Sequence, residues 1–441
     1  MPSSLQAVGI LSPSTLSGTP AWSATFSIDG KYLAVCFGNP NTHIKIWCIS
    51  TLSTSSLQND TSSNTTDSKK KDVDINKQWK LISTIREEHT RTIRSVSFAP
   101  TSSTISVPIL ASASFDGKVL IWECYPDATS TSISNNNNND MDDENTIENN
   151  LFEPIAQLEG HESEVKCLAW NTTGSLLASC GRDKTVWIWE CYLPGTIGGS
   201  ETTNDMQCGG GEEDGGEFEC LAVLQGHDGD VKSIVFGPSH SQWGEGDEVL
   251  YSASYDNTIK IWAEESGDWY CAATLNDVHS STIWSLGLTP SGLRLFSGSD
   301  DGSIAIWKMY TSSERKKLFP KLTGKAVCST DGLWNCVGKL PDAHSSYAIM
   351  SIDCAPSRVG HGRIASGGGD NCINIYREET TTAIADNDVP SSDTPKFTIE
   401  AVADDAHNGD VNCVKWHPRD GTCLVSCGDD GAVKLWKYQR K

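Results

Sequence analysis

One short pattern recurs along the whole of this chain and constrains its fold more than any other feature. It consists of a small residue, Asp, a turn residue, two β-branched or aliphatic positions and an aromatic residue, as in SFDGKVLIW, with the Asp six residues before the aromatic. The repeats end at Trp122, Trp189, Trp262, Trp307, Tyr376 and Trp436, and a weaker copy ends at Trp47. Repetition from end to end predicts one large repeat domain over residues 1–441.

Two further markers accompany each repeat. A His precedes the pattern and is followed by an aliphatic residue at the fourth position, and a Ser lies four residues before each Asp. Alternating apolar stretches with tight turns between them predict four short strands per repeat, which is the blade of a β-propeller. The clearest sets of four markers are His161, Ser179, Asp183 and Trp189; His227, Ser252, Asp256 and Trp262; His279, Ser297, Asp301 and Trp307; and His407, Ser426, Asp430 and Trp436.

The two ends of the chain fit the same interpretation. The last repeat stops at Trp436 without an outer strand of its own, and residues 5–11 form an unassigned strand ahead of the first repeat. We expect this strand to complete the seventh blade and close the ring, which would leave no open edge.

The markers resemble the WD40 family across nearly the whole chain, which implies an all-β, seven-bladed propeller. In that family the Asp accepts a hydrogen bond from the His, the His bonds the Ser, and the Ser contacts the Trp indole N–H. The recurring Ser, His and Asp are therefore predicted to be structural, since a catalyst has no use for six equivalent triads. With no Gly-rich phosphate loop, metal-ligand cluster or nucleophile elbow, we expect no enzyme activity, no metal and no cofactor.

Composition and charge narrow the functional classes to which this chain can belong. A net charge of −23 argues against a generic nucleic-acid binder. No segment approaches the roughly 18 apolar residues of a membrane span, and no secretory signal is evident. The 16 cysteines are scattered and form no CxxC motif, so reduced thiols are favoured over disulfides, zinc or iron–sulfur ligands.

Insertions fall mainly in the connection between the third and fourth strands of a repeat. Their low-complexity composition predicts disordered loops, at about 50–78, 127–150, 193–217, 310–330 and 379–395. The opposite side of the ring carries the His-bearing loops and the Asp turns, and is called the His/Asp face below. Its loops hardly vary in length, which favours a defined recognition surface, although the His–Asp contacts alone could require tight turns.

Basic and tryptophan residues are predicted to gather on the His/Asp face. Arg94, Lys166 and Lys232 each follow their His by five residues, Arg182 and Lys184 flank the third turn, and Trp22 and Trp284 occupy positions equivalent to the basic ones. Such a surface could anchor an acidic or carboxylate-ended peptide. The alternative is that these charges pair with carboxylates of neighbouring blades.

A more specific resemblance starts at the third repeat. EGHESEVKCLAWNTTGSLLASCGRDKTVWIWE (159–190) is similar to the third repeat of the WD40 scaffold of cytosolic iron–sulfur protein assembly, and HDGDVKSIVF (227–236) and SGSDDGSIAIWK (297–308) fit the same family. The resemblance implies a docking platform that carries no iron–sulfur cluster of its own and acts in the cytoplasm and nucleus. It implies an iron-only-hydrogenase-like cluster carrier, a HEAT-repeat subunit, a small companion subunit and apoprotein clients as partners, and no nucleic acid or membrane. It also makes Arg182 the functionally sensitive arginine, although Gly181 replaces the family's Ser.

Two other classes of propeller compete with this interpretation. Substrate receptors of cullin ubiquitin ligases commonly carry Trp-Asp-x-Arg at the end of a blade, whereas no Asp follows the closing aromatic residues here. Histone-binding propellers usually begin with a long helix, which Pro2, Pro13 and Pro20 disfavour. Assembly scaffold is the hypothesis that the sequence favours, with ubiquitin-ligase receptor or another interaction scaffold as the alternative.

Overall fold

The computed structural model describes residues 3–13, 18–49, 79–100, 107–125, 151–193, 216–238, 248–310, 334–356, 362–379 and 395–439. Apart from a few residues at their ends, the five predicted disordered segments lie outside these ranges. Within the described ranges every regular element is a β-strand, and no helix is long and apolar enough to cross a membrane.

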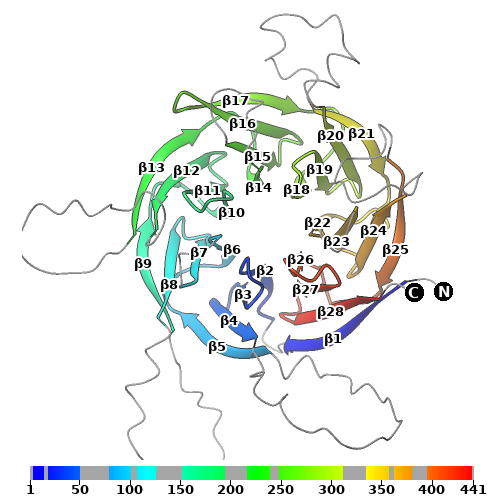
Figure 1. The fold of residues 1–441 in the computed structure, drawn as a ribbon, viewed down its shortest axis with the longest axis horizontal. Helices are drawn as coiled ribbons and strands as arrows, with labels where there is room; N and C mark the ends of the chain where they lie inside the picture. The colour runs from blue at the N-terminus through cyan, green and yellow to red at the C-terminus, as the bar shows by residue number, and fades with distance from the viewer. Residues whose placement is uncertain are drawn as a thin grey trace, which may run out of the picture.

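Seven antiparallel sheets of four strands each surround a central axis, like the blades of a propeller (Figure 1). The predicted all-β, seven-bladed propeller is therefore confirmed. In chain order the strands are β1 (Ser4–Ser12); β2 (Ala21–Phe26), β3 (Tyr32–Phe37), β4 (His43–Ile49) and β5 (Trp79–Arg86) in blade 1; β6 (Ile93–Phe98), β7 (Ile109–Ser114), β8 (Val119–Cys124) and β9 (Phe152–Leu158) in blade 2; β10 (Val165–Trp170), β11 (Leu176–Gly181), β12 (Val186–Tyr192) and β13 (Glu217–Leu224) in blade 3; β14 (Val231–Phe236), β15 (Val249–Ser254), β16 (Ile259–Glu265) and β17 (Asp268–Leu275) in blade 4; β18 (Ile283–Leu288), β19 (Arg294–Ser299), β20 (Ile304–Met309) and β21 (Trp334–Leu340) in blade 5; β22 (Ile349–Cys354), β23 (Arg363–Gly368), β24 (Ile373–Glu378) and β25 (Phe397–Ala403) in blade 6; and β26 (Cys413–Trp416), β27 (Cys423–Cys427) and β28 (Val433–Gln439) in blade 7.

Burial falls from the second strand of a blade to its outermost strand. All six residues of β7 (ILASAS), β11 and β15 are buried, because neighbouring blades cover both faces of the sheet at this radius. Each of these strands begins with large apolar residues and continues with a run of mostly small Ala, Ser, Cys or Gly residues, which allows the blades to pack closely. The outer strand β13 instead leaves Leu221 and Val223 exposed. The core thus lies between the blades rather than within any one of them.

The N-terminal strand closes the ring, as predicted. Strand β1 pairs with β28, so the seventh sheet has the order β1-β28-β27-β26, and its register places Ser4 opposite Gln439 and Ala7 opposite Trp436. Figure 1 shows β1 running along the rim beside β28, with both chain ends at this blade. Leu5 of β1 is buried in the core cluster shared by blades 6 and 7. The ring is therefore held shut by segments from opposite ends of the chain.

A β-bulge interrupts the innermost strand of six blades directly after its first residue. The extra residues are Trp22, Arg94, Lys166, Lys232, Trp284 and Met350. A bulge leaves its extra residue outside the hydrogen-bond ladder and turns that side chain away from the pleat. Because the ladder does not depend on these side chains, the position can carry a Trp, an Arg, a Lys or a Met in different blades.

Hydroxyl and thiol groups link successive innermost strands around the ring. Ser95, Ser233, Ser285 and Ser351 each accept a hydrogen bond from a backbone N–H of the next blade, at 3.2, 3.2, 2.8 and 3.0 Å. Between blades 7 and 1 the thiol of Cys413 takes this role, at 3.4 Å from the nitrogen of Ala24. The described cysteines are all unpaired, and Cys413 is among the buried ones. Cys413 therefore accepts the inter-blade hydrogen bond that a serine accepts in blades 2, 4, 5 and 6.

Candidate functional site

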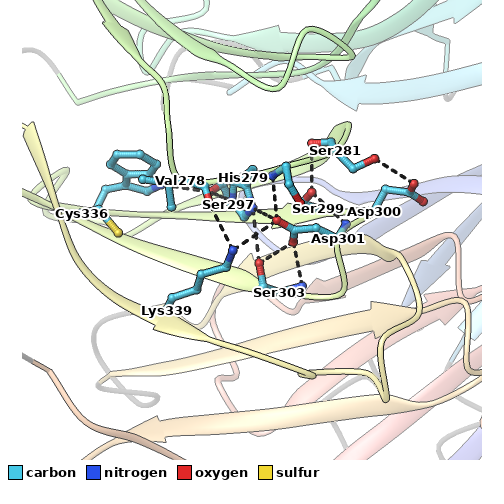
Figure 2. Close-up of polar contacts among 12 residues, drawn as sticks. Val278, His279, Ser281, Ser297, Ser299, Asp300, Asp301, Ser303, Cys336 and Lys339 are labelled. Carbon is cyan, nitrogen blue, oxygen red and sulfur yellow. Dashed lines mark hydrogen bonds and ion pairs between the residues drawn. The ribbon is translucent and has the colours of Figure 1, made fainter.

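Six blades contain the predicted hydrogen-bonded set of His, Ser and Asp. The His Nδ1–Asp distances are 2.7–3.1 Å and the His Nε2–Ser distances are 2.6–2.9 Å for the pairs led by His89, His161, His227, His279, His344 and His407. An ionised Asp requires the proton on Nδ1, which leaves Nε2 to accept from the Ser hydroxyl. Figure 2 shows His279 between Ser297 and Asp301, with Lys339 of the outer strand donating to Asp301 at 3.3 Å.

The serine completes the set by accepting a hydrogen bond from the closing tryptophan. The indole nitrogens of Trp122, Trp189, Trp262, Trp307 and Trp436 lie 2.8–2.9 Å from the Ser oxygens. All six serines of these sets have an exposed fraction of 0%. A hydroxyl without access to solvent cannot attack a substrate, so these sets hold the blade together and offer no nucleophile.

Blades 6 and 1 depart from the pattern. In blade 6 Tyr376 replaces the tryptophan, and its hydroxyl donates to the backbone oxygen of Ala343 at 2.7 Å. In blade 1 His43 is the first residue of β4, directly after the turn; it bonds the oxygen of Asn41 at 2.6 Å and stacks on Phe37. The weak first copy in the sequence therefore corresponds to a blade with a different turn.

The carboxylates of the six sets are held in the ionised form. Burial raises the pKa of Asp256, but hydrogen bonds from His227, Thr258 and the backbone of Asp228 lower it by more, so its pKa lies well below the usual range. The pKa values of Asp116, Asp183, Asp301, Asp370 and Asp430 are lowered in the same way. The folded state thus binds these protons more weakly than the unfolded state does, and acid must favour unfolding through these groups.

Acid titration of an Asp256→Asn variant tests this linkage. A depressed folded pKa contributes stability that is present above the unfolded pKa of about 3.9 and is lost as pH falls toward the folded pKa. The wild type should therefore exceed the variant in unfolding free energy by a constant amount above about pH 5, and by a shrinking amount from there to pH 3. Urea unfolding at each pH measures the difference, and a constant difference down to pH 3 would contradict the assignment.

Three cationic side chains surround the carboxylate of Glu164 on the His/Asp face. Its carboxylate oxygens lie 2.6 Å from Lys166 Nζ, 3.0 Å from Arg91 Nη2 and 3.5 Å from Arg182 Nη1. Burial raises the pKa of Glu164, but the bond from Lys166 and the neighbouring positive charges lower it further, so the net shift is downward. The Arg182 side chain keeps 60% of its surface exposed, and that of Arg91 keeps 52%. Three positive charges around one negative charge leave a net positive, accessible surface over blades 2 and 3.

Bulge residues of the innermost strands extend this surface to blades 1, 2, 4 and 5. Arg94 lies over the ring of Trp22 at 4.7 Å, and Lys232 lies over the ring of Trp284 at 5.1 Å. Burial lowers the pKa of Lys166, and the positive charges of Lys232 and Arg94 add to that shift, so the three cations share one electrostatic environment. The two tryptophans therefore serve as supports beneath cations and not as bare apolar anchors.

The sequence left open whether these cations pair with carboxylates of neighbouring blades, and the partners of Lys166, Lys232 and Arg182 lie in their own blades. Lys166 and Lys232 bond carboxylates two residues earlier in their own blades, Glu164 and Asp230, at 2.6 and 3.0 Å. Arg91, which is not one of the predicted cations, bonds a carboxylate of the next blade, that of Glu164, at 3.0 Å. Lys184 stands apart from the cluster, since it lines a groove on the outer side of its turn.

Sequence reasoning missed two members of the cluster, Arg91 and Glu164. Both lie in His-bearing loops, two and three residues after His89 and His161 respectively. A signal was present, because a carboxylate also stands three residues after His227 and His407, as Asp230 and Asp410. That regularity concerns charge rather than apolar periodicity, so a search for strands passes over it.

Comparison with known proteins places these blades in a family. The WD40 family, described as WD domain, G-beta repeat, matches residues 79–123, 152–190, 218–263, 269–308 and 399–437. Proteins named "Probable cytosolic iron-sulfur protein assembly protein 1" are similar over most of the chain. The protein of Botryotinia fuckeliana is 32% identical over 81% of this chain and 86% of its own length, and that of Meyerozyma guilliermondii is 32% identical over 92% and 100%. The chain belongs to this family.

Membership confirms the resemblance that the sequence suggested and covers most of the ring. A third member of the cytosolic iron-sulfur protein assembly protein 1 family, from Candida albicans, is 33% identical over 82% of this chain and 88% of its own length. Among the described residues, no group of three or more His, Cys, Asp or Glu side chains is arranged to hold a metal ion. On the His/Asp face, Arg182 and Arg91 present exposed positive charge.

Proposed function

We propose that this chain is a non-catalytic scaffold in cytosolic iron–sulfur protein assembly. The observation that carries the proposal is the cation cluster around Glu164, which lies on a propeller of a family whose members are named for this process. The role is to dock a cluster carrier and apoprotein clients, so that clusters reach cytosolic and nuclear iron–sulfur proteins. The scaffold itself would hold its partners in position through its charged surface, and the partners would carry the iron–sulfur cluster.

The partners that fit the proposal are an iron-only-hydrogenase-like cluster carrier, a HEAT-repeat subunit and a small companion subunit. Arg182, Arg94, Lys166 and Lys232 form the binding surface in this proposal, together with Trp22 and Trp284 beneath the cations and Lys184 at its edge. Guanidinium groups bind carboxylates in a bidentate geometry, so an acidic or carboxylate-ended peptide suits this surface. Protein complexes form faster when opposite charges face each other, and an exposed Arg182 offers such a charge.

Replacing Arg182 by Glu should separate binding from folding. The Arg182–Glu164 ion pair is long, at 3.5 Å, and its arginine is mostly exposed, so its loss should change stability by less than about 1 kcal/mol. Reversal of the charge should weaken capture of the carrier and of clients about tenfold or more, which corresponds to ~1.4 kcal/mol. Thermal melting and quantitative affinity purification with mass spectrometry measure the two effects.

Arg419→Glu provides the matched control. Arg419 is an exposed arginine in the loop between β26 and β27, on the face opposite the His/Asp face. It introduces the same charge change far from the cluster, so partner capture should stay at the wild-type level. Normal capture by Arg182→Glu, or equal loss in both variants, would contradict the site. Recovery of a cullin adaptor by the wild type in place of the carrier would contradict the function.

A further inference from the structure

A groove of about 620 Å³ lies on the His/Asp face at the junction of blades 3 and 4, outside the cation cluster. Its walls come from the loop before β10, the turn after β11 and the loop between β13 and β14, and they include Gly160, Glu162, Lys184, Val223 and Asp228. Trp187 of β12 also lines it. The equivalent positions of the other blades hold Lys, Leu, Ala or Asn, so the blade fold does not require an aromatic residue here.

Trp187 lines the groove and is held in place by its neighbours. One face of its indole stacks on Trp189, with ring centroids 5.3 Å apart and an interplanar angle of 17°, and the ring of His161 lies 5.4 Å away at an angle of 46°. Its ring edge packs so closely on Gly160 that an added Cβ there would lie 2.3 Å from the ring. Its indole nitrogen donates to Thr185 at 2.9 Å. A half-buried ring with a satisfied N–H thus lines the groove, and the π face of an indole attracts cations.

The charged residues that line the groove also favour a cationic ligand. Glu162 and Asp228 are exposed at its rim, and their carboxylates have no hydrogen bond to another described side chain. Asp183 also lines the groove and is ionised, but its oxygens accept four hydrogen bonds, from His161, the backbone of Glu162, and both the backbone and the side chain of Thr185. Three carboxylates against the single ammonium of Lys184 leave the groove negative, in contrast to the positive cluster around Glu164.

We propose that this groove binds an arginine side chain presented by an extended segment of a partner protein. The planar guanidinium would stack on the indole of Trp187 while its N–H groups donate to Glu162 and Asp228, and its aliphatic stem would pack on Val223. A flat cation suits a single aromatic face better than a rounded ammonium, for which several aromatic walls are needed. Among the residues that line the groove, His227 is the other ring, and it is engaged with Asp256 and Ser252.

Nuclear magnetic resonance of indole groups can test the site in the full chain. Protein labelled with ¹⁵N-tryptophan gives one indole signal per tryptophan, and the signal of Trp187 is identified by its loss in Trp187→Leu. The probes are the blocked tripeptides Ac-Gly-Arg-Gly-NH₂, Ac-Gly-Glu-Gly-NH₂ and Ac-Gly-norleucine-Gly-NH₂. The arginine probe should shift the Trp187 signal saturably, the norleucine probe should bind roughly fivefold to tenfold more weakly, and the glutamate probe should leave the signal unchanged.

Carboxylate variants complete the test. The double variant Glu162→Gln and Asp228→Asn should weaken the arginine probe about tenfold while the other indole signals keep their positions, which shows that the fold is intact. Glu265→Gln removes an exposed carboxylate at the end of β16 and should leave binding unchanged. Absence of a shift at Trp187, equal affinity for the arginine and norleucine probes, or a shift by the glutamate probe would overturn the proposal. None of these outcomes bears on Arg182, so this site and the proposed scaffold surface can fail separately.

Discussion

Deletion of β1 is expected to destabilise the entire propeller rather than fray one terminus. Seven residues of β1 have register partners in β28, and Leu5 packs into the core shared by blades 6 and 7. Backbone hydrogen bonds contribute about 1 kcal/mol net each, so losing this strand and its buried side chain should cost at least about 4 kcal/mol. The deletion should lower the melting temperature of all blades together, as circular dichroism would show, and should promote aggregation through the bare edge of β28.

A pair of point variants keeps this prediction testable if the deletion does not fold. Leu5→Ala removes a side chain that is 8% exposed, and should cost about 2–4 kcal/mol. Gln6→Ala changes the next residue of the same strand, which is exposed, and should have little effect. Equal stability of the two variants, or a deletion that melts within a few degrees of the full chain, would show that the ring does not depend on β1.

Asp256→Ala is expected to destabilise blade 4 strongly, although the substitution removes no apolar side chain. The carboxylate accepts hydrogen bonds from His227 at 2.7 Å, from the backbone of Asp228 at 2.9 Å and from the backbone and side chain of Thr258 at 2.9 and 2.6 Å. Its removal leaves His227, a buried donor, without a partner and frees the turn, so we expect a loss of about 2–4 kcal/mol in unfolding free energy. Urea unfolding followed by tryptophan fluorescence measures this loss.

Asp228→Ala controls for the loss of one negative charge close to the same hydrogen-bonded set. Asp228 is exposed, and only its backbone nitrogen contributes to the set around His227. This variant removes one carboxylate without removing an acceptor for His227, so its stability should stay within about 0.5 kcal/mol of the wild type. If the two variants are equally stable, the hydrogen-bonded set does not hold the blade.

The strands and the His–Ser–Asp sets were predictable because each depends on a pattern that the chain repeats. Apolar stretches separated by turns mark the strands, and the Ser always lies four residues before the Asp, so Ser179 and Asp183 meet His161 in one blade as their equivalents do in five others. The role of β1 was also predictable, since an unpaired strand and an incomplete blade imply each other. The repeats were therefore enough to predict the fold, including a contact between residues more than 400 positions apart.

The contacts of the candidate site were not predictable, because they depend on how side chains of different loops, in part from different blades, come together. The sequence placed Arg182 and Lys166 on one face, but not on one carboxylate, since Glu164 is reached by Arg91 of the preceding blade as well. Nor did it show that Arg94 would cover Trp22, because that contact depends on the rotation between blades 1 and 2 and on a bulge in each. The groove beside Trp187 likewise needs loops from two blades.

The pairing of β1 with β28 also sets the order of events during synthesis. At about 5–20 residues per second, the ribosome reaches β28 on the order of tens of seconds after β1 has been made. Over that interval β1 has no partner, while the earlier blades can form and stack as each emerges. The last event must be capture of the waiting strand by the newest one. A chaperone that shields β1 during translation would therefore protect the step on which the closed ring depends.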